Sequence, residues 1–568
     1  MKETFPTIKA GYIFNPLKYN GEVNLKLNSI EINYPCRLDA MAINPAAVVY
    51  NDDMVFTPGE VVVSLNKFIN VKIKVLSSSG GKLIISNNTK RKVLIKHSYL
   101  LMCQALNVSP SLEIDVNDFD IPKHCGFGSS SSTISAVAAA INELYGCPIE
   151  NSDLIKYLAS NHGEEINDKD EDNLKVVQCI GGGATNGLIE EGIIIIAGKS
   201  TTITKMKYDA EVLICIPKDF KEKDAKVLME LEEKNLWKFK ETGEKYAEKI
   251  AYNLLHKALP GLVNGSINEL AKVVYEYRFN MGSNENCSFV YDGLVELGNK
   301  LRDLYENNDC EFLALSSVGP AFFVIVKDQI QKEKCKKKMK ELNLNIIESS
   351  ICNTTYKVKE KEEVKLFWQE EETSKAFSNK EPSKYITRIL ETFDLNNKNC
   401  IDIGCGGGRY TRYLKQRGAN VLAIDKYPEM IGDVNYAKIN FINCNMNKIP
   451  VKDNSYDLVL SIGVIHNSVT IDEFKESIKE IYRISNINSN VVLSLFTNDV
   501  ITDDLIKYGE NLYKVKDRPP MVLLSKEQIY KILKENNLKV IKEVDEHVTD
   551  VGGGKRNVYT ILLKKQIV

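Results

Sequence analysis

The stretch from Cys400 to Ile431, CIDIGCGGGRYTRYLKQRGANVLAIDKYPEMI, decides the fold of the C-terminal third of the chain. An apolar run, a glycine-rich turn, a helical segment and a second apolar run follow one another in it. The second run ends in Asp425, about twenty residues after Gly404, and an acidic residue at that place can bind ribose hydroxyls. The order predicts a strand-turn-helix-strand unit with a nucleotide-like cofactor at the turn. A tight structural turn without a ligand is the alternative.

The segments that follow continue this alternation. Residues 421–425 (VLAID), 456–463 (YDLVLSIG) and 491–496 (VVLSLF) are typical of buried strands, and helical sequence separates them. Strands that alternate with helices indicate a parallel sheet covered on both faces. The C-terminal part is therefore predicted to be an α/β, doubly wound (Rossmann-like) domain.

The glycine turn also distinguishes between two kinds of cofactor. A dinucleotide site needs a small residue at the end of Gly-x-Gly-x-x-Gly/Ala, because the helix must approach the strand beside the pyrophosphate. Here that position holds the bulky Arg409, which disfavours NAD. The pattern DIGCGGG at 402–408 instead resembles motif I of class I S-adenosylmethionine (SAM)-dependent methyltransferases. The resemblance covers nearly everything from residue 368 to residue 563.

This resemblance implies SAM as the cofactor and assigns its contacts by family order. FINCNMNKIP (441–450) stands where the family contacts adenine, and FSNKEPSKYI (377–386) resembles the helical lid before motif I. Asn445 is a departure, since many members carry Asp there. The implied cofactor contacts are Tyr385, Asp402, Gly404, Cys405, Gly406, Gly408, Asp425, Lys426, Asn445, Met446 and Ser461.

His466 is the titratable residue on the loop after the fourth strand, SYDLVLSIGVIHN (455–467). Methyl transfer from a sulfonium requires a positioned acceptor and, for some acceptors, removal of a proton. His466 is therefore the candidate catalytic residue, with cofactor positioning and a structural role as alternatives. VGGGKRNVYTILLKK (551–565) resembles the family's terminal antiparallel hairpin, on which Arg556 is a candidate substrate contact.

The N-terminal part reads as a separate α+β domain, since its strands and helices do not alternate regularly. Its most chemically distinctive segment is PKHCGFGSSSSTISAVAAAINELYG (122–146), a glycine loop that feeds four serines and an alanine-rich helix. Free backbone N–H groups and the helix dipole converge there on a point that suits a phosphate. It is not a Walker A loop, because no lysine follows the last glycine. A serine-capped buried helix is the alternative.

This segment resembles the phosphate-binding motif of the GHMP superfamily of small-molecule kinases, so a GHMP-kinase-like fold is expected. YPCRLDA (34–40) and LALSSVGPAFFVIV (313–326) occupy the places of further family motifs. The second of these lacks the glycine run of the kinases and, like CIGGGATNGLIEEG (179–192), resembles β-ribofuranosylaminobenzene 5′-phosphate synthase. That branch transfers phosphoribosyl from phosphoribosyl pyrophosphate to a ring carbon, and C-nucleoside synthases are related. A phosphoribosyl-transferring domain is favoured over an ATP-dependent kinase and over a non-catalytic binding module.

The GHMP resemblance implies a set of residues that bind the phosphorylated substrate. These are Arg37, Lys123, Gly126, Gly128, Ser129, Ser130, Ser131, Gly182, Gly183, Ser316, Ser317 and Gly319. Mg²⁺ is expected with a polyphosphate donor, and the acidic stretch HGEEINDKDED (162–172) offers Glu164 and Glu165 as metal ligands. Such charged runs are usually solvated loops.

Composition and charge set the remaining expectations. The predicted domains are residues 1–357 and 373–568, joined by a charged linker at 358–372 (VKEKEEVKLFWQEEE). A formal charge of −2 favours small-molecule substrates over nucleic acid or membrane partners. Thirteen scattered cysteines without a CxxC pair, no leader-like start and no long apolar run predict a cytoplasmic protein. The oligomeric state is open, with a homodimer as one expectation.

Overall fold

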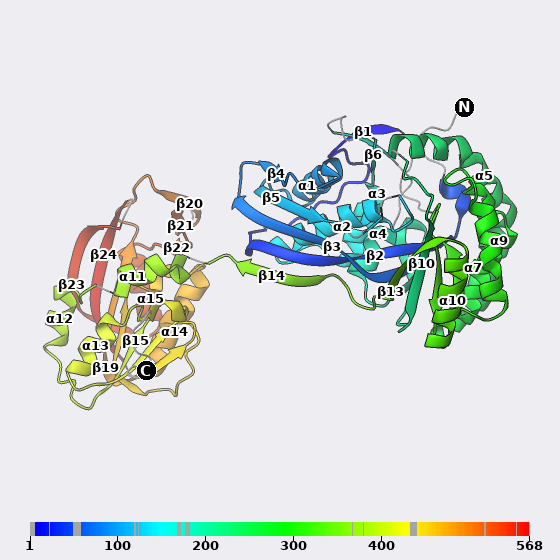
Figure 1. Cartoon of the computed structure of the whole chain (residues 1–568). Helices are drawn as coiled ribbons and strands as arrows, with labels where there is room; N and C mark the ends of the chain where they lie inside the picture. Colours follow the sequence, from blue (N-terminus) through cyan, green and yellow to red (C-terminus); the bar gives the residue numbers. More distant parts are fainter. Residues whose placement is uncertain are drawn as a thin grey trace. The chain divides into compact units, whose positions relative to one another are not determined.

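The chain divides into two compact units, Met1–Val364 and Lys365–Val568 (Figure 1). The computed structural model describes residues 6–21, 23–48, 58–118, 121–122, 124–166, 172–176, 182–223, 225–365, 367–378, 380–431, 440–515, 518–551 and 554–566. Each unit has its own hydrophobic core.

A seven-stranded, largely antiparallel sheet forms the base of the first unit. In sheet order its strands are β14 (Lys357–Glu363), β2 (Leu27–Ala42), β3 (Glu60–Ser77), β5 (Ser111–Asn117) and β4 (Leu83–Ile85), and β8 (Ile193–Ala197) pairs with β3 and with β9 (Thr201–Met206). β3 and β8 are rich in valine and isoleucine, which favour the pleated, half-buried surface of a sheet. The antiparallel register places Arg37 of β2 opposite Ser64 of β3.

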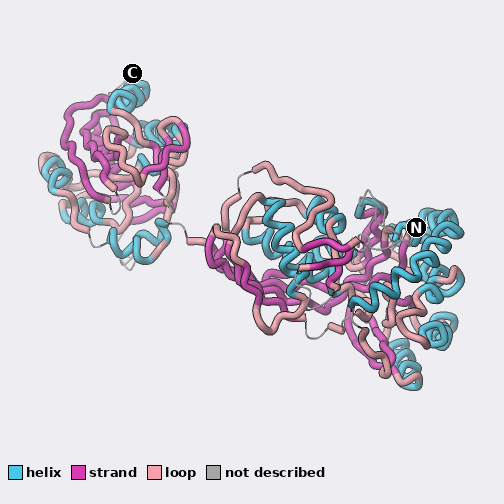
Figure 2. Tube along the Cα trace, turned by 90° about the horizontal axis from the view of Figure 1, so that it is seen from above, coloured by secondary structure: helices cyan, strands magenta, loops and turns pink. Residues whose placement is uncertain are grey.

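Four helices lie on one side of this sheet (Figures 1 and 2). They are α1 (Lys92–Leu106), α2 (Ser129–Leu144), α3 (Asn151–Ser160) and α4 (Gly182–Leu188). α2 is buried along nearly its whole length because alanines and serines let α1, α4 and the sheet approach it closely. The sheet and α1 therefore fix the position of the α2 N-terminus.

A second, four-stranded antiparallel sheet completes the first unit. Its order is β11 (Phe312–Leu315), β12 (Phe322–Val326), β10 (Glu211–Pro217) and β13 (Leu344–Ser350). The helices of this region are α5 (Ala225–Asn253), α6 (Leu259–Val263), α7 (Asn268–Asn280), α8 (Ser283–Asn286), α9 (Leu294–Glu306) and α10 (Gln329–Glu341), and a small sheet holds β1 (Thr7–Lys9), β7 (Asn173–Lys175) and β6 (Glu164–Glu165). The turn between β11 and β12 carries Ser316 to Pro320 toward β2.

The predicted charged linker differs from the structure in its first half. Residues 357–363 form β14, which pairs with β2 as an edge strand and is exposed along its whole length. Charged side chains are common on edge strands, because they discourage pairing with other chains. Lys359 lies 3.3 Å from Glu31 of β2. The boundary between the units therefore falls at Val364 and Lys365, inside the predicted range.

The second unit is a seven-stranded doubly wound sheet. Its order is β17 (Asn440–Asn443), β16 (Asn420–Asp425), β15 (Asn399–Ile403), β18 (Tyr456–Ile462), β19 (Ser485–Thr497), β24 (Lys555–Lys565) and β23 (Leu538–Asp550). The first five strands are parallel, and β24 is antiparallel to both neighbours, as the sequence predicts. The other elements are α11 (Glu371–Ser378), α12 (Lys384–Leu390), α13 (Arg409–Gln416), α14 (Ile471–Ile484), α15 (Lys526–Glu535), β20 (Leu505–Gly509), β21 (Leu512–Val515) and β22 (Met521–Val522).

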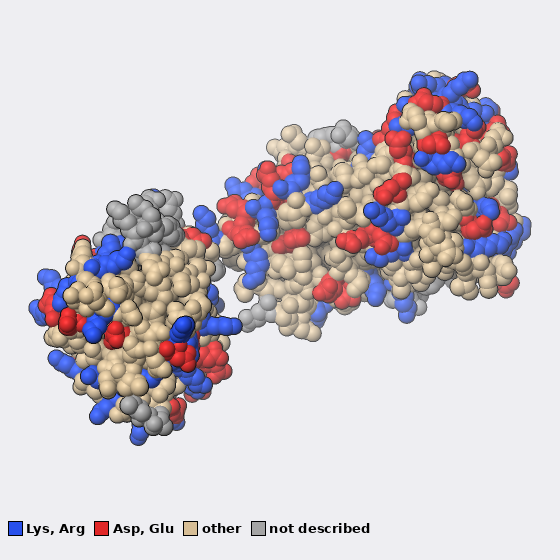
Figure 3. Space-filling view, turned by 90° about the horizontal axis from the view of Figure 1, so that it is seen from below, with Lys and Arg blue, Asp and Glu red and all other residues tan. Residues whose placement is uncertain are grey.

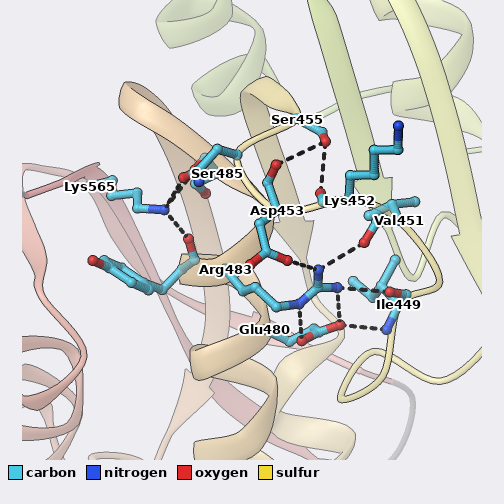
Figure 4. Close-up of polar contacts among 11 residues, drawn as sticks. Ile449, Val451, Lys452, Asp453, Ser455, Glu480, Arg483, Ser485 and Lys565 are labelled. Carbon is cyan, nitrogen blue, oxygen red and sulfur yellow. Dashed lines mark hydrogen bonds and ion pairs between the residues drawn. The ribbon is translucent and has the colours of Figure 1, made fainter.

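A polar network holds the loop that leads into β18 (Figure 4). Arg483, near the end of α14, donates to the carbonyls of Ile449 and Val451 at 2.8 Å and pairs with Glu480 and Asp453. Glu480 accepts the backbone N–H of Ile449 at 2.7 Å. Because one guanidinium joins helix and loop, the start of β18 is fixed relative to α14.

Charges of both signs are interspersed over the face of each unit that Figure 3 shows. None of the helices in the described part of the chain is long and apolar enough to cross a membrane.

We expect a fragment from Lys365 to Val568 to fold alone, because the contact boundary lies at its first residue and its sheet has the full order of seven strands. Thermal unfolding followed by circular dichroism should show one cooperative transition. Its midpoint should lie within about 4 °C of the corresponding transition of the full chain, the shift that about 1 kcal/mol produces in a domain of this size. A fragment without cooperative unfolding would contradict this independence.

Candidate functional site

The turn after β15 is built from glycines that no other residue could replace without strain. Gly404 and Gly408 have φ of +65° and +72°. A Cβ on Gly404 would lie 2.3 Å from Cγ2 of Val464. The backbone therefore turns sharply between β15 and α13, beside the loop that follows β18.

Asp425 stands at the carboxyl end of β16, next to this turn. Its Oδ2 accepts the N–H of Gly406 at 2.9 Å, and its Oδ1 accepts the N–H of Tyr427 at 2.9 Å. Burial raises the pKa of Asp425, while the two backbone donors oppose that shift. The turn thus holds a carboxylate in a fixed orientation at the cavity wall.

A cavity of about 730 Å³ opens at the carboxyl ends of the parallel strands. Of the predicted cofactor contacts, those that line it are Tyr385, Asp402, Gly404, Cys405, Gly406, Asp425, Lys426, Asn445 and Met446. Gly408 instead caps α13, and Ser461 is buried within β18. Nine residues that are scattered over 62 positions of the sequence are therefore brought to one cavity.

Asp402 faces this cavity from the end of β15. Its Oδ2 accepts the hydroxyl of Thr411 at 2.7 Å, and burial raises the pKa of Asp402 to about 6. The structure thus holds an acidic group that is partly protonated near neutral pH under the glycine turn.

Asp402 should therefore lower the stability of the protein as the pH rises. Because its folded pKa of about 6 exceeds the ordinary value of 3.8, the folded state holds the proton more tightly than the unfolded state. The free energy of unfolding should fall between about pH 4 and pH 6, by an amount on the order of 3 kcal/mol from this group. Asp402→Asn should lose this fall in urea unfolding curves. An equal pH dependence in both proteins would contradict the prediction.

Asn445 and Met446 lie where the resemblance places the adenine. Asn445 donates from Nδ2 to Oε1 of Glu473 at 3.2 Å, and Oε2 of Glu473 accepts the N–H of Val469 at 2.7 Å. All four residues line the cavity. The amide of Asn445 is thus held against the carboxylate of Glu473 on this wall of the cavity.

His466 lies at the cavity but is 1% exposed. Its Nδ1 accepts the N–H of Phe496 at 3.2 Å, and its ring centroid lies 4.1 Å from that of Phe496. Burial, together with the charge of Arg556, lowers the pKa of His466 to about 3. The imidazole is therefore neutral at pH 7, and this bond assigns its proton to Nε2.

Two further cavity residues, Asp545 and His547 of β23, are absent from the sequence-based assignment. Nδ1 of His547 lies 2.5 Å from Oδ2 of Asp545, and its ring stacks on that of Tyr385 with centroids 5.5 Å apart. The only sequence signal was their spacing of two on a strand, which places both on one face. Arg556 also lines the cavity, with Nη2 bonded to Asp504.

The glycine loop of the first unit packs against two neighbours. A Cβ on Gly126 (φ +91°) would lie 2.5 Å from the carbonyl of Ser316, and one on Gly128 (φ +60°) would lie 2.8 Å from Nε of Arg37. The hydroxyl of Ser316 donates to the carbonyl of Gly126 at 2.6 Å. The loop, β2 and the β11–β12 turn are thereby joined at the start of α2.

A smaller cavity, of about 120 Å³, lies at this point. The predicted residues that line it are Arg37, Gly126, Gly128, Ser129, Ser130, Ser131, Glu164, Ser317 and Gly319. Ser316 is buried and holds the loop. Gly183 packs so closely against α2 that a Cβ on it would lie 2.2 Å from the Cβ of Ser131. Gly182 begins α4, and Lys123 lies outside the described residues.

Arg37 is the feature of this cavity that points most directly to an anion. It is 1% exposed, and within the described part of the chain its Nε and Nη1 have no hydrogen-bond partner. Its ion pair with Glu60 is long, 3.7 Å from Nη1 to Oε2. A buried guanidinium with unused donors beside a helix N-terminus suits a phosphate.

Arg91 is a cation of this site that the sequence did not reveal. It precedes α1 with a left-handed backbone (φ +57°), is 2% exposed, and donates to the hydroxyls of Ser129, at 3.0 Å, and Ser130. Its guanidinium also lies 3.5 Å from Glu164 and 3.9 Å from Glu165. A positive side chain between the serines and the carboxylates therefore organises the loop.

The metal ligands predicted at Glu164 and Glu165 stay a prediction. Both carboxylates face Arg91, and Glu164 also accepts the hydroxyl of Ser130 at 2.8 Å. Among the described residues no group of three acidic, histidine or cysteine side chains could hold a metal ion. In this structure the charge of the Arg91 guanidinium thus lies beside both carboxylates.

Two titratable groups face the phosphate-sized cavity from outside the loop. Burial lowers the pKa of His162 to about 4, and burial together with the charge of Glu164 raises the pKa of Glu232 on α5 to about 7. His162 is therefore neutral at pH 7, and Glu232 can gain or lose a proton there. Arg278, also missed, donates to the carbonyls of Ser317 and Asp39, both at 3.1 Å, and so holds the β11–β12 turn against β2.

Comparison with known proteins matches one domain family in each unit. Residues 401–493 match the family described as "Methyltransferase domain", and residues 93–171 match "GHMP kinases N terminal domain". The ubiquinone biosynthesis O-methyltransferase of Rickettsia bellii is 30% identical over 87 residues, which are 14% of this chain and 36% of that protein. The chain thus spans about a third of the length of this curated relative.

Solved structures similar to each unit also exist. Homoserine kinase from Cytophaga hutchinsonii covers 58% of this chain and 97% of its own, at 14% identity and a TM-score of 0.41. The 1,6-didemethyltoxoflavin-N1-methyltransferase of Burkholderia thailandensis, with bound S-adenosylhomocysteine, covers 32% of this chain and 78% of its own, at 17% identity and a TM-score of 0.26. The predicted two-domain fold class is confirmed. The chain thus contains a region that matches the GHMP kinase N-terminal domain and a region that matches a methyltransferase domain.

Proposed function

We propose that the second unit transfers a methyl group from SAM to a small molecule. The observation that carries this proposal is Asp425, whose carboxylate the glycine turn orients at the wall of a cavity of about 730 Å³. SAM supplies a methyl group on a positively charged sulfonium. Asp425 would bind the ribose hydroxyls, Asn445 and Met446 would border the adenine, and the neutral His466 would orient ligands through its remaining N–H.

For the first unit we propose a phosphorylated donor held at the start of α2. Gly126 and Gly128 expose the backbone, Ser129 to Ser131 offer hydroxyls, and Arg37 offers buried donors that have no hydrogen-bond partner among the described residues. These groups suit the oxygens of a phosphate. Glu232 of α5, which also lines this cavity, would accept a proton from the second substrate.

We propose phosphoribosyl pyrophosphate as this donor, with a small (hetero)aromatic acid as the acceptor and loss of CO₂ as the accompanying step. The support is the resemblance of residues 316–320 and 179–192 to the synthase rather than to the kinases. ATP is the alternative donor, and the matched GHMP kinase family favours it. Mg²⁺ would accompany either donor, although the described residues contain no metal-ligand cluster.

The two donors can be told apart by their products. The full chain would be incubated with Mg²⁺, an extract of small molecules and either donor. Pyrophosphate release from phosphoribosyl pyrophosphate supports the synthase, and ADP release from ATP supports the kinase. Neither product, with retained binding of phosphoribosyl pyrophosphate in calorimetry, would indicate a domain that only presents substrate to the methyltransferase. We further propose a cytoplasmic protein that acts on small molecules and not on nucleic acid or membranes.

A further inference from the structure

The cavity of the second unit holds two histidines in opposite hydrogen-bonding states. In His466 the backbone N–H of Phe496 occupies Nδ1, so the remaining nitrogen carries the proton and can only donate. In His547 the Asp545 carboxylate lies 2.5 Å from Nδ1, so that nitrogen carries the proton and Nε2 keeps its lone pair. Of the two, His547 is therefore the one that can accept a proton.

The exposure of the two rings also favours His547 as the proton acceptor. The side chain of His547 is 39% exposed and that of Asp545 12%, so a ligand can reach the imidazole while the carboxylate stays sheltered behind it. His466 is buried. Stacking on Tyr385 of α12 and the bond to Asp545 fix the plane of the His547 ring.

The cavity wall indicates the class of molecule that would meet this ring. Aromatic side chains border the space from several elements, among them Phe367, Trp368, Phe377, Tyr385, Tyr427 and Phe496. Such walls favour flat aromatic ligands. Arg556 adds a buried guanidinium that pairs with Asp504 through Nη2, while its Nε has no hydrogen-bond partner within the described part of the chain and leaves one donor for a carboxylate of the ligand.

We propose that His547, oriented by Asp545, is the catalytic base of the methyl transfer and that the acceptor is the hydroxyl of an aromatic acid. This inference rests on the proposed methyltransferase function. A phenolic hydroxyl, with a pKa near 10, needs a base at neutral pH, whereas a carboxylate acceptor is already ionised. A base poised in the cavity therefore fits the hydroxyl and not the carboxylate.

In the proposed methyl transfer, each bond that forms is matched by one that breaks. The acceptor oxygen forms a bond to the methyl carbon as the carbon–sulfur bond breaks, and that electron pair stays on sulfur as a neutral thioether. The hydroxyl proton passes to Nε2 of His547, which becomes an imidazolium beside the Asp545 carboxylate and then returns the proton to water. The products are S-adenosylhomocysteine and an aryl methyl ether.

The test uses the full chain, SAM and two acceptor sources: a panel of catechol, protocatechuate and hydroxyquinoline, and a small-molecule cell extract. His547→Asn should lower kcat by about 10²–10⁴-fold, the usual contribution of general base catalysis, with KM and S-adenosylhomocysteine affinity unchanged. Asp545→Asn should lower kcat less. Added imidazole should restore turnover to His547→Gly, a rescue that a structural role would not give. Lys542→Ala, an exposed change on the same strand, is the matched control and should act as the wild type.

Each contrary result has a separate meaning. A His547→Asn variant that keeps kcat within about two-fold would overturn the base. A wild type that binds S-adenosylhomocysteine but forms no aryl methyl ether from either source would overturn the acceptor class. A wild type that binds no S-adenosylhomocysteine in calorimetry would overturn the proposed function itself.

Discussion

Replacing Gly128 by valine should abolish turnover of the phosphorylated donor while methyl transfer survives. The residue has φ +60°, which a β-branched side chain adopts only with strain. The added Cβ would lie 2.8 Å from Nε and 2.9 Å from Cγ of Arg37, so it would displace the buried guanidinium from the start of α2. We expect release of pyrophosphate or ADP to fall by about 10²-fold or more, as when a positioned donor is removed from an active site.

Gly265→Val separates this effect from backbone strain alone. Gly265 also has a positive φ, +77°, but a Cβ there would meet nothing within 4 Å. It should lose stability without losing donor turnover. If Gly128→Val, folded by circular dichroism, still turns over the donor at the wild-type rate, the phosphate site is wrong. If it loses both activities while folded, the two units are coupled.

Replacing Asp425 by alanine should weaken the binding of S-adenosylhomocysteine by about 1.5–3 kcal/mol, roughly 10- to 150-fold, the effect of losing hydrogen bonds to a charged group. Two effects contribute. The ribose hydroxyls would lose their acceptor, and the N–H groups of Gly406 and Tyr427 would lose the carboxylate that holds the turn.

Asp472→Ala is the matched control for this variant. Asp472 is an exposed carboxylate in the first turn of α14, in the same unit, and does not line the cavity. Its affinity for S-adenosylhomocysteine in isothermal titration should equal that of the wild type. Unchanged affinity in Asp425→Ala would refute the assignment of the ribose contact.

The sequence predicted many of the residues that line the larger cavity because they lie at strand ends. Gly404, Asp425 and Asn445 each lie within two residues of the carboxyl end of a parallel strand, and such ends meet at one edge of a sheet. Tyr385 and Met446 were placed by family order and also line the cavity. The strand ends seen in the sequence and the order of strands in the sheet thus identify the same residues.

What the sequence could not predict depends on contacts between distant segments. Arg91 reaches Ser129 only because α1 packs beside α2, and His547 enters the cavity only because β23 closes the sheet at its antiparallel end. Both faces of the edge strand β14 lie in solvent, so its residues do not alternate between apolar and polar. Without that alternation the sequence indicated a linker. The burial of His466 could not be read from its loop position in the sequence, and its catalytic role stays a prediction.

The most direct test of the account is methyl transfer by the full chain. SAM and a small-molecule extract would be given to the wild type, and mass spectrometry would search for a metabolite that gains the mass of one methylene group. The account predicts such a product, formed by the wild type and lost in proportion to SAM affinity in Asp425→Ala. An unchanged metabolite profile from a wild type that binds S-adenosylhomocysteine would contradict it.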